Sequence, residues 1–128
     1  MSDLETKYTK DHEVVKVEHG DVAVIGITEY AQHALGDLVF VDLPEVGQNV
    51  EKGEDFAAVE SVKVTAEVYT PVTGEVVAIN EDLADDLDLI TESFEKGWIA
   101  KVKMDNPDEL SELMDEAAYK QFCEEQDD

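Results

Sequence analysis

The residue in this chain best suited to covalent chemistry is Lys63. It is the only positive charge between Gly53 and Glu95, a segment with twelve carboxylates, and a valine lies on each side of it. An acidic residue would solvate the surface equally well there, so a single lysine suggests that its amine is used. Two interpretations remain open: an ordinary surface lysine in a half-buried strand, which composition alone favours, and a lysine presented for acylation.

A bend is expected at Lys63, because the apolar stretch around it is too long for one strand. Residues 56–70 would span about 50 Å as a single strand, whereas a domain of this size is roughly 36 Å across. The strand face that begins at Phe56 would also bury Glu60 if it continued. We therefore expect the alternation to fail at Glu60 and Ser61 and to resume at Val64, with a hairpin bend on the lysine.

The pattern P-x-x-G-x-x-V occurs twice, at residues 44–50 and 71–77, and the two copies flank Lys63. Each copy is typical of a turn that leads into a strand. The repetition suggests two related half-sheets that exchange at the lysine.

Composition excludes several classes of function. The 128 residues fit one domain, and 33 acidic residues against nine lysines give a net charge of −24 with no arginine. Nucleic acid and anionic membranes require clustered positive charge, so both are excluded as expected partners, and proteins with basic docking patches are favoured. Without arginine, a G-x-G-x-x-G motif or a Walker motif, a nucleotide-dependent enzyme is not expected.

The residues that resemble metal or redox sites do not complete one. Cys123 is the only cysteine, so there is no internal disulfide or C-x-x-C pair, and redox chemistry would need a bound cofactor. The segment from His12 to Lys16 misses the H-E-x-x-H zinc motif at its last position. Residues 81–88 carry five acids without the glycine or ligand order of a calcium loop. We expect no metal site.

The expected compartment is the cytoplasm. The first residues lack both the apolar run of a secretory signal and the arginine-rich character of a mitochondrial transit peptide. No apolar run approaches the length that spans a membrane. A mature mitochondrial protein given a new start methionine would look the same and is the alternative.

The predicted elements are mainly strands. Strands are expected at residues 20–27 and 38–43, on both sides of Lys63, and at 75–79. A short helix is expected at 29–35, between an N-cap at Thr28 and Gly36. A helix should also begin at 105–108, with an apolar face of Leu110, Leu113 and Met114, and Asp115 should cap a last helix. We expect a single domain over 1–128, with its core at about 8–122 and an acidic, frayed tail at 123–128.

Several motifs, in order, resemble the glycine cleavage system H protein family. They are Val24-Ile25-Gly26-Ile27-Thr28, Leu35-Gly36-Asp37, Leu43-Pro44-Glu45-Val46-Gly47, Glu60-Ser61-Val62-Lys63, Pro71-Val72-Thr73-Gly74-Glu75-Val76, Gly97-Trp98, and the region from Glu109 to Tyr119. The likeness runs from Tyr8 to about Phe122. It covers nearly the whole chain.

The resemblance implies a barrel-sandwich hybrid, the fold of lipoyl and biotinyl carriers, with lipoic acid joined as an amide to Lys63 at a hairpin tip. The protein would be a monomeric carrier and not a catalyst. Its arm would take the aminomethyl group of glycine from the pyridoxal-phosphate glycine decarboxylase to the tetrahydrofolate-dependent aminomethyltransferase. Dihydrolipoamide dehydrogenase would then reoxidise the arm, and a lipoylating enzyme would first attach it.

Three carboxylates are candidates for helping this arm. Glu60 is a candidate for recognition during lipoylation, and an ordinary turn carboxylate is the equal alternative. By resemblance, Glu13 would lie near a cleft that shelters the loaded arm, where a carboxylate could hold the aminomethyl nitrogen. Glu67 could join it, although an exposed strand residue is the simpler interpretation. The family usually has tryptophan directly after the position of Glu13, whereas this chain has Val14.

Other carriers match less well. A biotinyl carrier would show Met-Lys-Met at the hairpin and a 2-oxoacid dehydrogenase lipoyl domain Asp-Lys-Ala, whereas this chain has Val62-Lys63-Val64. A lipoyl-relay protein that donates its cofactor to other complexes remains an alternative. So does an acidic interaction domain whose lysine is unmodified.

Overall fold

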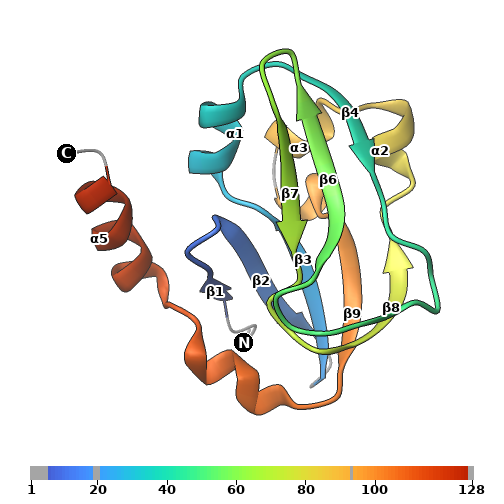
Figure 1. Cartoon of the computed structure of the whole chain (residues 1–128), viewed down its shortest axis with the longest axis vertical. Helices are drawn as coiled ribbons and strands as arrows, with labels where there is room; N and C mark the ends of the chain where they lie inside the picture. Colours follow the sequence, from blue (N-terminus) through green and yellow to red (C-terminus); the bar gives the residue numbers. More distant parts are fainter. Residues whose placement is uncertain (1–5, 19–20, 93, 127–128) are drawn as a thin grey trace.

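The computed structural model describes residues 6–18, 21–92 and 94–126, and most of its regular structure is β (Figure 1). The strands are β1 (Thr6–Tyr8), β2 (Glu13–Glu18), β3 (Val22–Ile27), β4 (Leu38–Asp42), β5 (Asn49–Val50), β6 (Asp55–Ser61), β7 (Thr65–Tyr69), β8 (Gly74–Ile79) and β9 (Ala100–Met104). The helices are α1 (Glu29–Leu35), α2 (Asp82–Asp85), α3 (Leu89–Glu92), α4 (Phe94–Gly97), the 3₁₀ helix η1 (Pro107–Glu112) and α5 (Glu116–Gln126).

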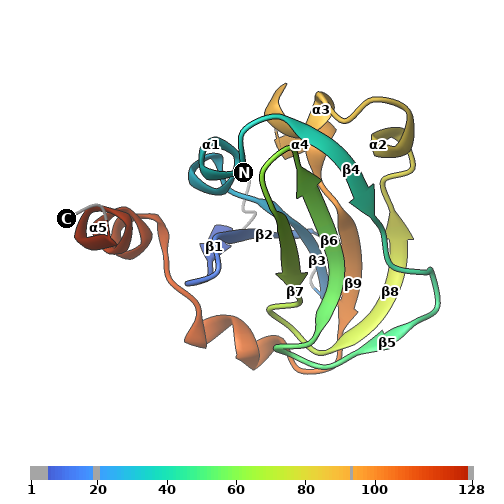
Figure 2. The same cartoon turned by 45° about the horizontal axis from the view of Figure 1, so that its top comes forward.

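The strands form two sheets. The larger has the order β1-β2-β3-β9-β8-β5, the smaller β4-β6-β7, and the two lie face to face (Figure 2). The residues between them form one hydrophobic cluster rich in valine, because β-branched side chains pack well on pleated surfaces. Fully buried examples are Val15, Ile25, Val76 and Val102 from the larger sheet and Val59 and Val68 from the smaller. This arrangement is the expected mainly β, two-sheet fold.

The two P-x-x-G-x-x-V copies lie side by side in the larger sheet. The amide of Gly47 donates to the carbonyl of Val76 at 2.7 Å, and the amide of Val76 donates to the carbonyl of Gln48 at 2.9 Å. The glycines differ in role: Gly47 has a φ of +95° with open space around it, whereas a β-carbon on Gly74 would lie 2.0 Å from a backbone oxygen. The prediction that the two copies belong to half-sheets that exchange at Lys63 is wrong. Both copies lie in the larger sheet, and the strands on either side of Lys63, β6 and β7, belong to the smaller one.

The short helix α1 has the predicted ends. The hydroxyl of Thr28 accepts from the amide of Ala31 at 3.2 Å, as an N-cap does. Gly36 ends the helix with a φ of +81° and donates its amide to the carbonyl of Gln32. These caps fix where the chain leaves α1 and enters β4.

The C-terminal region differs from the prediction in two ways. The 3₁₀ helix η1 ends at Glu112, so Met114 does not share a helical face with Leu110; it instead pairs with Tyr8 through backbone hydrogen bonds of 2.8 and 2.9 Å. Asp115 caps α5 as expected, accepting from the amide of Ala118 at 2.8 Å. The helix then continues to Gln126, so residues 123–126 are not a frayed tail; residues 127 and 128 lie outside the described chain.

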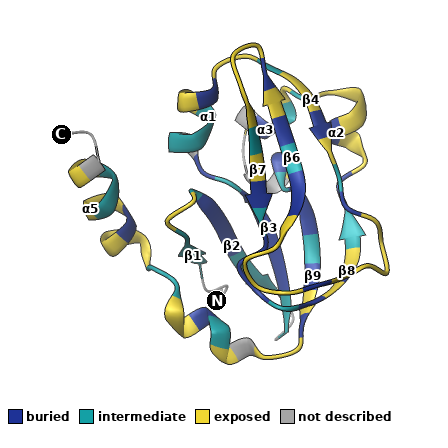
Figure 3. Ribbon diagram, in the orientation of Figure 1, coloured by how far each residue is buried: buried dark blue, intermediate teal, exposed yellow. Residues whose placement is uncertain are grey.

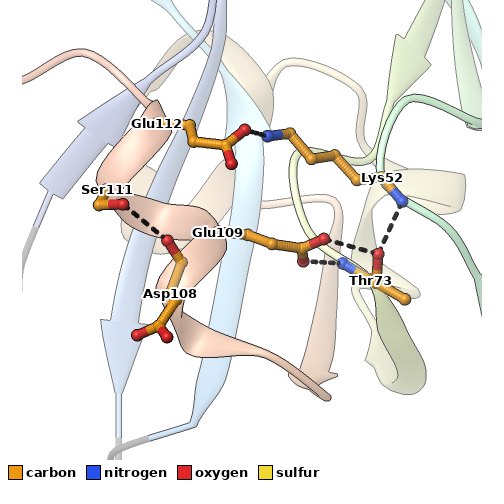
Figure 4. A network of polar contacts seen from close by, with 6 residues as sticks. All are labelled: Lys52, Thr73, Asp108, Glu109, Ser111 and Glu112. Carbon is orange, nitrogen blue, oxygen red and sulfur yellow. Dashed lines mark hydrogen bonds and ion pairs between the residues drawn. The ribbon is translucent and has the colours of Figure 1, made fainter.

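Polar contacts attach η1 to two turns that precede strands (Figure 4). The Glu109 carboxylate accepts from the amide of Thr73 at 2.7 Å and from its hydroxyl at 2.9 Å. That hydroxyl also accepts from the amide of Lys52, whose side chain pairs with Glu112. The network joins the turns before β6 and β8 to the C-terminal segment.

Candidate functional site

Lys63 lies at the exposed tip of the hairpin formed by β6 and β7, where the sequence predicts a bend. A serine closes the turn. The amide of Ser61 donates to the carbonyl of Val64 at 2.8 Å, and its hydroxyl accepts from the amides of Lys63 and Val64, each at 3.1 Å. The same hydroxyl donates to the carbonyl of Val64 at 3.1 Å. Ser61 is buried, and its hydroxyl is the acceptor that holds the backbone of the turn.

The hairpin tip is also fixed to the chain that leaves α1. The amide of Val62 donates to the carbonyl of Asp37 at 3.0 Å. A β-carbon placed on Gly36 would lie 3.4 Å from Cε of Lys63 and 3.8 Å from its Nζ. The lysine side chain therefore lies along Gly36, where the missing β-carbon leaves its path open.

The predicted break in alternation at Glu60 and Ser61 is wrong. Ala57, Val59 and Ser61 all face inward, so the alternation runs to the end of the strand. Glu60 is exposed on the outer face, opposite Phe40 on one side and Thr65 on the other. The register shifts earlier, between Asp55 and Ala57, and this irregularity moves the inward face from Phe56 to Ala57.

Glu13, at the start of β2, is a buried carboxylate that links the two sheets. It is only 2% exposed. Its Oε1 accepts from the hydroxyl of Thr9 at 2.7 Å, and its Oε2 accepts from the backbone amide of Tyr69 at 2.8 Å. The Thr9 hydroxyl is held in turn by the amides of Asp11 and Glu13, which both donate to it at 3.1 Å.

Burial raises the pKa of Glu13 from 4.5 to about 7, and the negative charge of Asp11 adds to this. The hydrogen bonds from Thr9 and Tyr69 act in the opposite direction and favour the ionised form. The carboxyl therefore changes charge near neutral pH. A cation brought close to it would favour its ionised form.

Tyr69 contacts both Glu13 and Glu67. Its backbone amide binds Glu13, while its hydroxyl donates to Oε1 of Glu67 at 3.0 Å. Glu67 is exposed on β7, the strand that descends from the Lys63 tip. The structure thus joins two of the three predicted carboxylates through one tyrosine, and leaves Glu60 closer to the tip.

Sequence reasoning missed Ser61, Tyr69 and Thr9 as contributors to this site. Ser61 lies inside the motif that marks the lysine, and a serine two residues before an expected turn residue is a signal for a side-chain-closed turn. Tyr69 acts partly through its backbone, and Thr9 acts through a contact that depends on the local fold. Neither has a local pattern that would identify it.

The described residues contain no cluster of three or more histidine, cysteine or acidic side chains that could hold a metal ion. None of the described helices is long and apolar enough to cross a membrane.

The comparisons with known proteins agree with this geometry. A sequence model of the glycine cleavage H-protein family matches residues 6–126. The chain belongs to the glycine cleavage H-protein family. A relative named glycine cleavage system H protein, from Xanthobacter autotrophicus, is 56% identical and spans 92% of this chain and 94% of its own. One from Staphylococcus carnosus is 51% identical, over 94% of this chain and 96% of its own.

A solved structure supports the same assignment. The crystal structure of a glycine cleavage system H protein from Mycobacterium marinum superposes with a TM-score of 0.80 at 35% identity, covering 92% of this chain and 95% of that one. This confirms the barrel-sandwich hybrid expected from the sequence. H proteins are lipoyl carriers of the glycine cleavage system, so this chain is a carrier subunit that works with the other components of that system and not an enzyme.

Proposed function

We propose that Lys63 carries the lipoyl group of this H protein as an amide on Nζ. The observation that carries the proposal is the exposed Lys63 at the tip of a turn fixed by Ser61. The Lys63 amine makes no ion pair with any residue in the described ranges. By contrast, Lys52, Lys96, Lys101 and Lys120 each pair with a carboxylate. A rigid turn that presents an unpaired amine suits both acylation and a flexible arm.

The partners would follow from the chemistry of that arm. When attached, the lipoyl group supplies a disulfide that takes up the aminomethyl group of glycine and is later restored from the dithiol. We infer that the chain serves the pyridoxal-phosphate glycine decarboxylase, the tetrahydrofolate-dependent aminomethyltransferase and dihydrolipoamide dehydrogenase in turn. We further infer a monomer in the cytoplasm, modified by a separate lipoylating enzyme.

The carboxylates would act on the charged end of the loaded arm. An aminomethyl nitrogen is cationic near neutral pH, and Glu67 lies at the surface on the strand below Lys63. Glu13 is bound to the backbone amide of Tyr69, two residues further along the strand, and would attract the same cation through its charge, since pairing favours the ionised carboxylate. Glu60, exposed near the tip, is proposed to contact the lipoylating enzyme.

The first test is the intact mass of the protein made with lipoic acid and a lipoate ligase, beside a Lys63→Arg variant. We expect one lipoyl addition in the wild type and none in the variant. Addition to neither protein would refute the carrier proposal for Lys63. Addition to both would place the cofactor on another lysine.

A second test separates glycine cleavage from lipoyl relay. The lipoylated protein is mixed with purified glycine decarboxylase, and exchange of labelled bicarbonate into glycine is measured. We expect exchange that depends on lipoylated Lys63. No exchange, together with transfer of the lipoyl group to another complex, would favour the relay protein.

A further inference from the structure

Exposed hydrophobic side chains gather around Lys63. Six large hydrophobic residues are exposed in the described chain, and four of them lie at the hairpin tip and the start of β4. These are Val39 (51%), Phe40 (56%), Val62 (66%) and Val64 (54%), which we call the Lys63 collar. The exposed tip and the chain from α1 to β4 lie together at the top of Figure 3. Exposed apolar groups with a polar rim mark interaction sites.

A β-bulge in β4 places two of these side chains at the surface. Leu38 pairs with Ser61 and Phe40 with Glu60, so Val39 is an extra residue between two successive pairs. Leu38 packs on the core and Val41 is buried, while both residues between them point outward. A regular strand would alternate and turn one of the two inward. The bulge thus presents a wider apolar surface than a regular strand would.

The two halves of the Lys63 collar form one surface with the acceptor amine. The hydrogen bond from Val62 to the carbonyl of Asp37 fixes the tip beside the start of β4. The Lys63 side chain lies along Gly36, the residue before Asp37. A protein that covers the collar therefore also covers the lysine.

The rim of the Lys63 collar is acidic. Asp37, Asp42 and Glu60 are all exposed there. Segments 37–42 and 60–65 contain no basic residue other than Lys63. Charge complementarity therefore calls for an apolar hollow edged by lysine or arginine side chains on the partner.

We propose that the Lys63 collar is the docking surface for the enzyme that acylates Lys63, and that Phe40 is its anchor. The inference rests on the proposed lipoylation of this lysine. An acylating enzyme must bring Nζ itself to an activated carbonyl, so it must contact the turn directly, whereas enzymes that act on the far end of an acyl arm work further away. The unprotonated amine attacks an acyl adenylate: the C–N bond forms, the bond from the acyl carbon to the phosphate oxygen breaks, adenylate leaves with the electron pair, and the amine loses a proton to solvent.

The test compares serine substitutions inside and outside the Lys63 collar. Phe40→Ser and Val62→Ser remove collar contacts, and Val46→Ser is the matched control because Val46 is 60% exposed beside β5. We expect kcat/KM for lipoylation by a lipoate ligase to fall at least tenfold for Phe40→Ser and severalfold for Val62→Ser, with Val46→Ser unchanged. Acylation of Lys63 by a small N-hydroxysuccinimidyl ester, measured on the peptide that contains Lys63 because the ester also reacts with the other lysines, should be equal in all four proteins, since the amine itself is unaltered.

A binding measurement separates failure of docking from failure of the proposed function. The ligase is titrated against two unlipoylated proteins, the Lys63→Arg variant and the double variant that also carries Phe40→Ser. The double variant should bind the ligase at least tenfold more weakly. Wild-type kcat/KM and Kd in the collar variants would overturn the docking proposal while lipoylation of Lys63 stands. Lack of lipoylation in the wild type would overturn the proposed function, and the Kd comparison would still decide whether the Lys63 collar binds the enzyme.

Discussion

Two buried polar side chains determine much of the site at the scale of single residues. Ser61 uses its hydroxyl to hold both amides of the Lys63 turn. Glu13 uses its carboxylate to join the start of β2 to the backbone of β7 through Tyr69. Each is costly to bury and therefore depends on its hydrogen bonds. Removing either side chain should therefore change the free energy of unfolding more than removing an exposed polar side chain does.

Ser61→Ala should destabilise the protein and loosen the hairpin tip. The change leaves the amides of Lys63 and Val64 without their side-chain acceptor, and because water can replace it at the exposed tip, the cost should be about 0.5–1.5 kcal/mol. Denaturant unfolding and amide hydrogen exchange measure the two effects. Ser111→Ala is the control, because its exposed hydroxyl only donates to a carbonyl in η1. Unchanged hydrogen-exchange rates at the amides of Lys63 and Val64 would show that the serine does not hold the turn.

Glu13 should make stability fall as pH rises from acid to neutral. Because its folded pKa of about 7 is above its ordinary value of 4.5, the neutral form is favoured in the folded state. That contribution is fully present below pH 4.5 and is lost as pH rises through 7, a change of about 3 kcal/mol in the free energy of unfolding. The measurement is denaturant unfolding at several pH values for wild type and Glu13→Gln. Parallel pH curves for the two proteins would contradict the prediction.

At the scale of elements, α5 is attached to the body mainly through Tyr119. Its ring stacks on Tyr8 with centroids 4.6 Å apart. Its hydroxyl lies 2.8 Å from Nδ1 of His12 and 2.7 Å from the hydroxyl of Thr28. His12 precedes Glu13, and Thr28 caps α1, so this helix supports both segments that border the site.

Tyr119→Phe should therefore weaken the attachment of α5 while keeping the ring stack. The loss of two hydrogen bonds at a buried hydroxyl should cost about 1–3 kcal/mol. Hydrogen exchange should accelerate in α5 before it changes in the sheets. Tyr69→Phe is the comparison, since its hydroxyl bond to Glu67 is exposed to water and should contribute little to stability. Equal effects in the two variants would show that Tyr119 has no special role in attachment.

The elements that depend on local signals could be predicted from the sequence, and those that depend on cross-strand pairing could not. Thr28 and Gly36 fixed α1 because caps act within one turn of helix. The bulge at Val39 and the shift before Ala57 could not be foreseen, because each is a mismatch between two strands distant in sequence. The bridge between Tyr8 and Met114 is of the same kind.

The site follows the same division. Lys63 is predicted from its isolation among acids and from its motif, which are properties of the sequence alone. Resemblance predicts a role for Glu13, but its burial and its bond to the backbone of Tyr69 arise only when the two sheets meet. The predicted inward face of β6 is wrong for a related reason, since one register shift exchanges the two faces of a strand.

At the scale of the whole molecule, the net charge of −24 should govern how partners find the carrier. Charges act over about 30 Å at 0.01 M salt and only about 8 Å at 0.15 M. The association rate of a partner with a basic patch should therefore be lower by about tenfold or more at the higher salt. Its dissociation rate should change little. Stopped-flow binding of a lipoate ligase or dihydrolipoamide dehydrogenase measures both rates.

Two substitutions that each remove one negative charge can show whether the attraction of a partner acts through the Lys63 collar. Asp42→Asn removes an acid from its rim, and Asp108→Asn removes an exposed acid from η1 at the other end of the molecule (Figure 1). Long-range attraction by net charge alone would slow association equally in both. Local complementarity should slow it more in Asp42→Asn, because the rim charge lies within a Debye length of the bound partner at either salt. An association rate that is flat in salt would leave docking to apolar contacts alone. Equal slowing in the two variants would show that the net charge attracts the partner without any special role for the rim of the Lys63 collar.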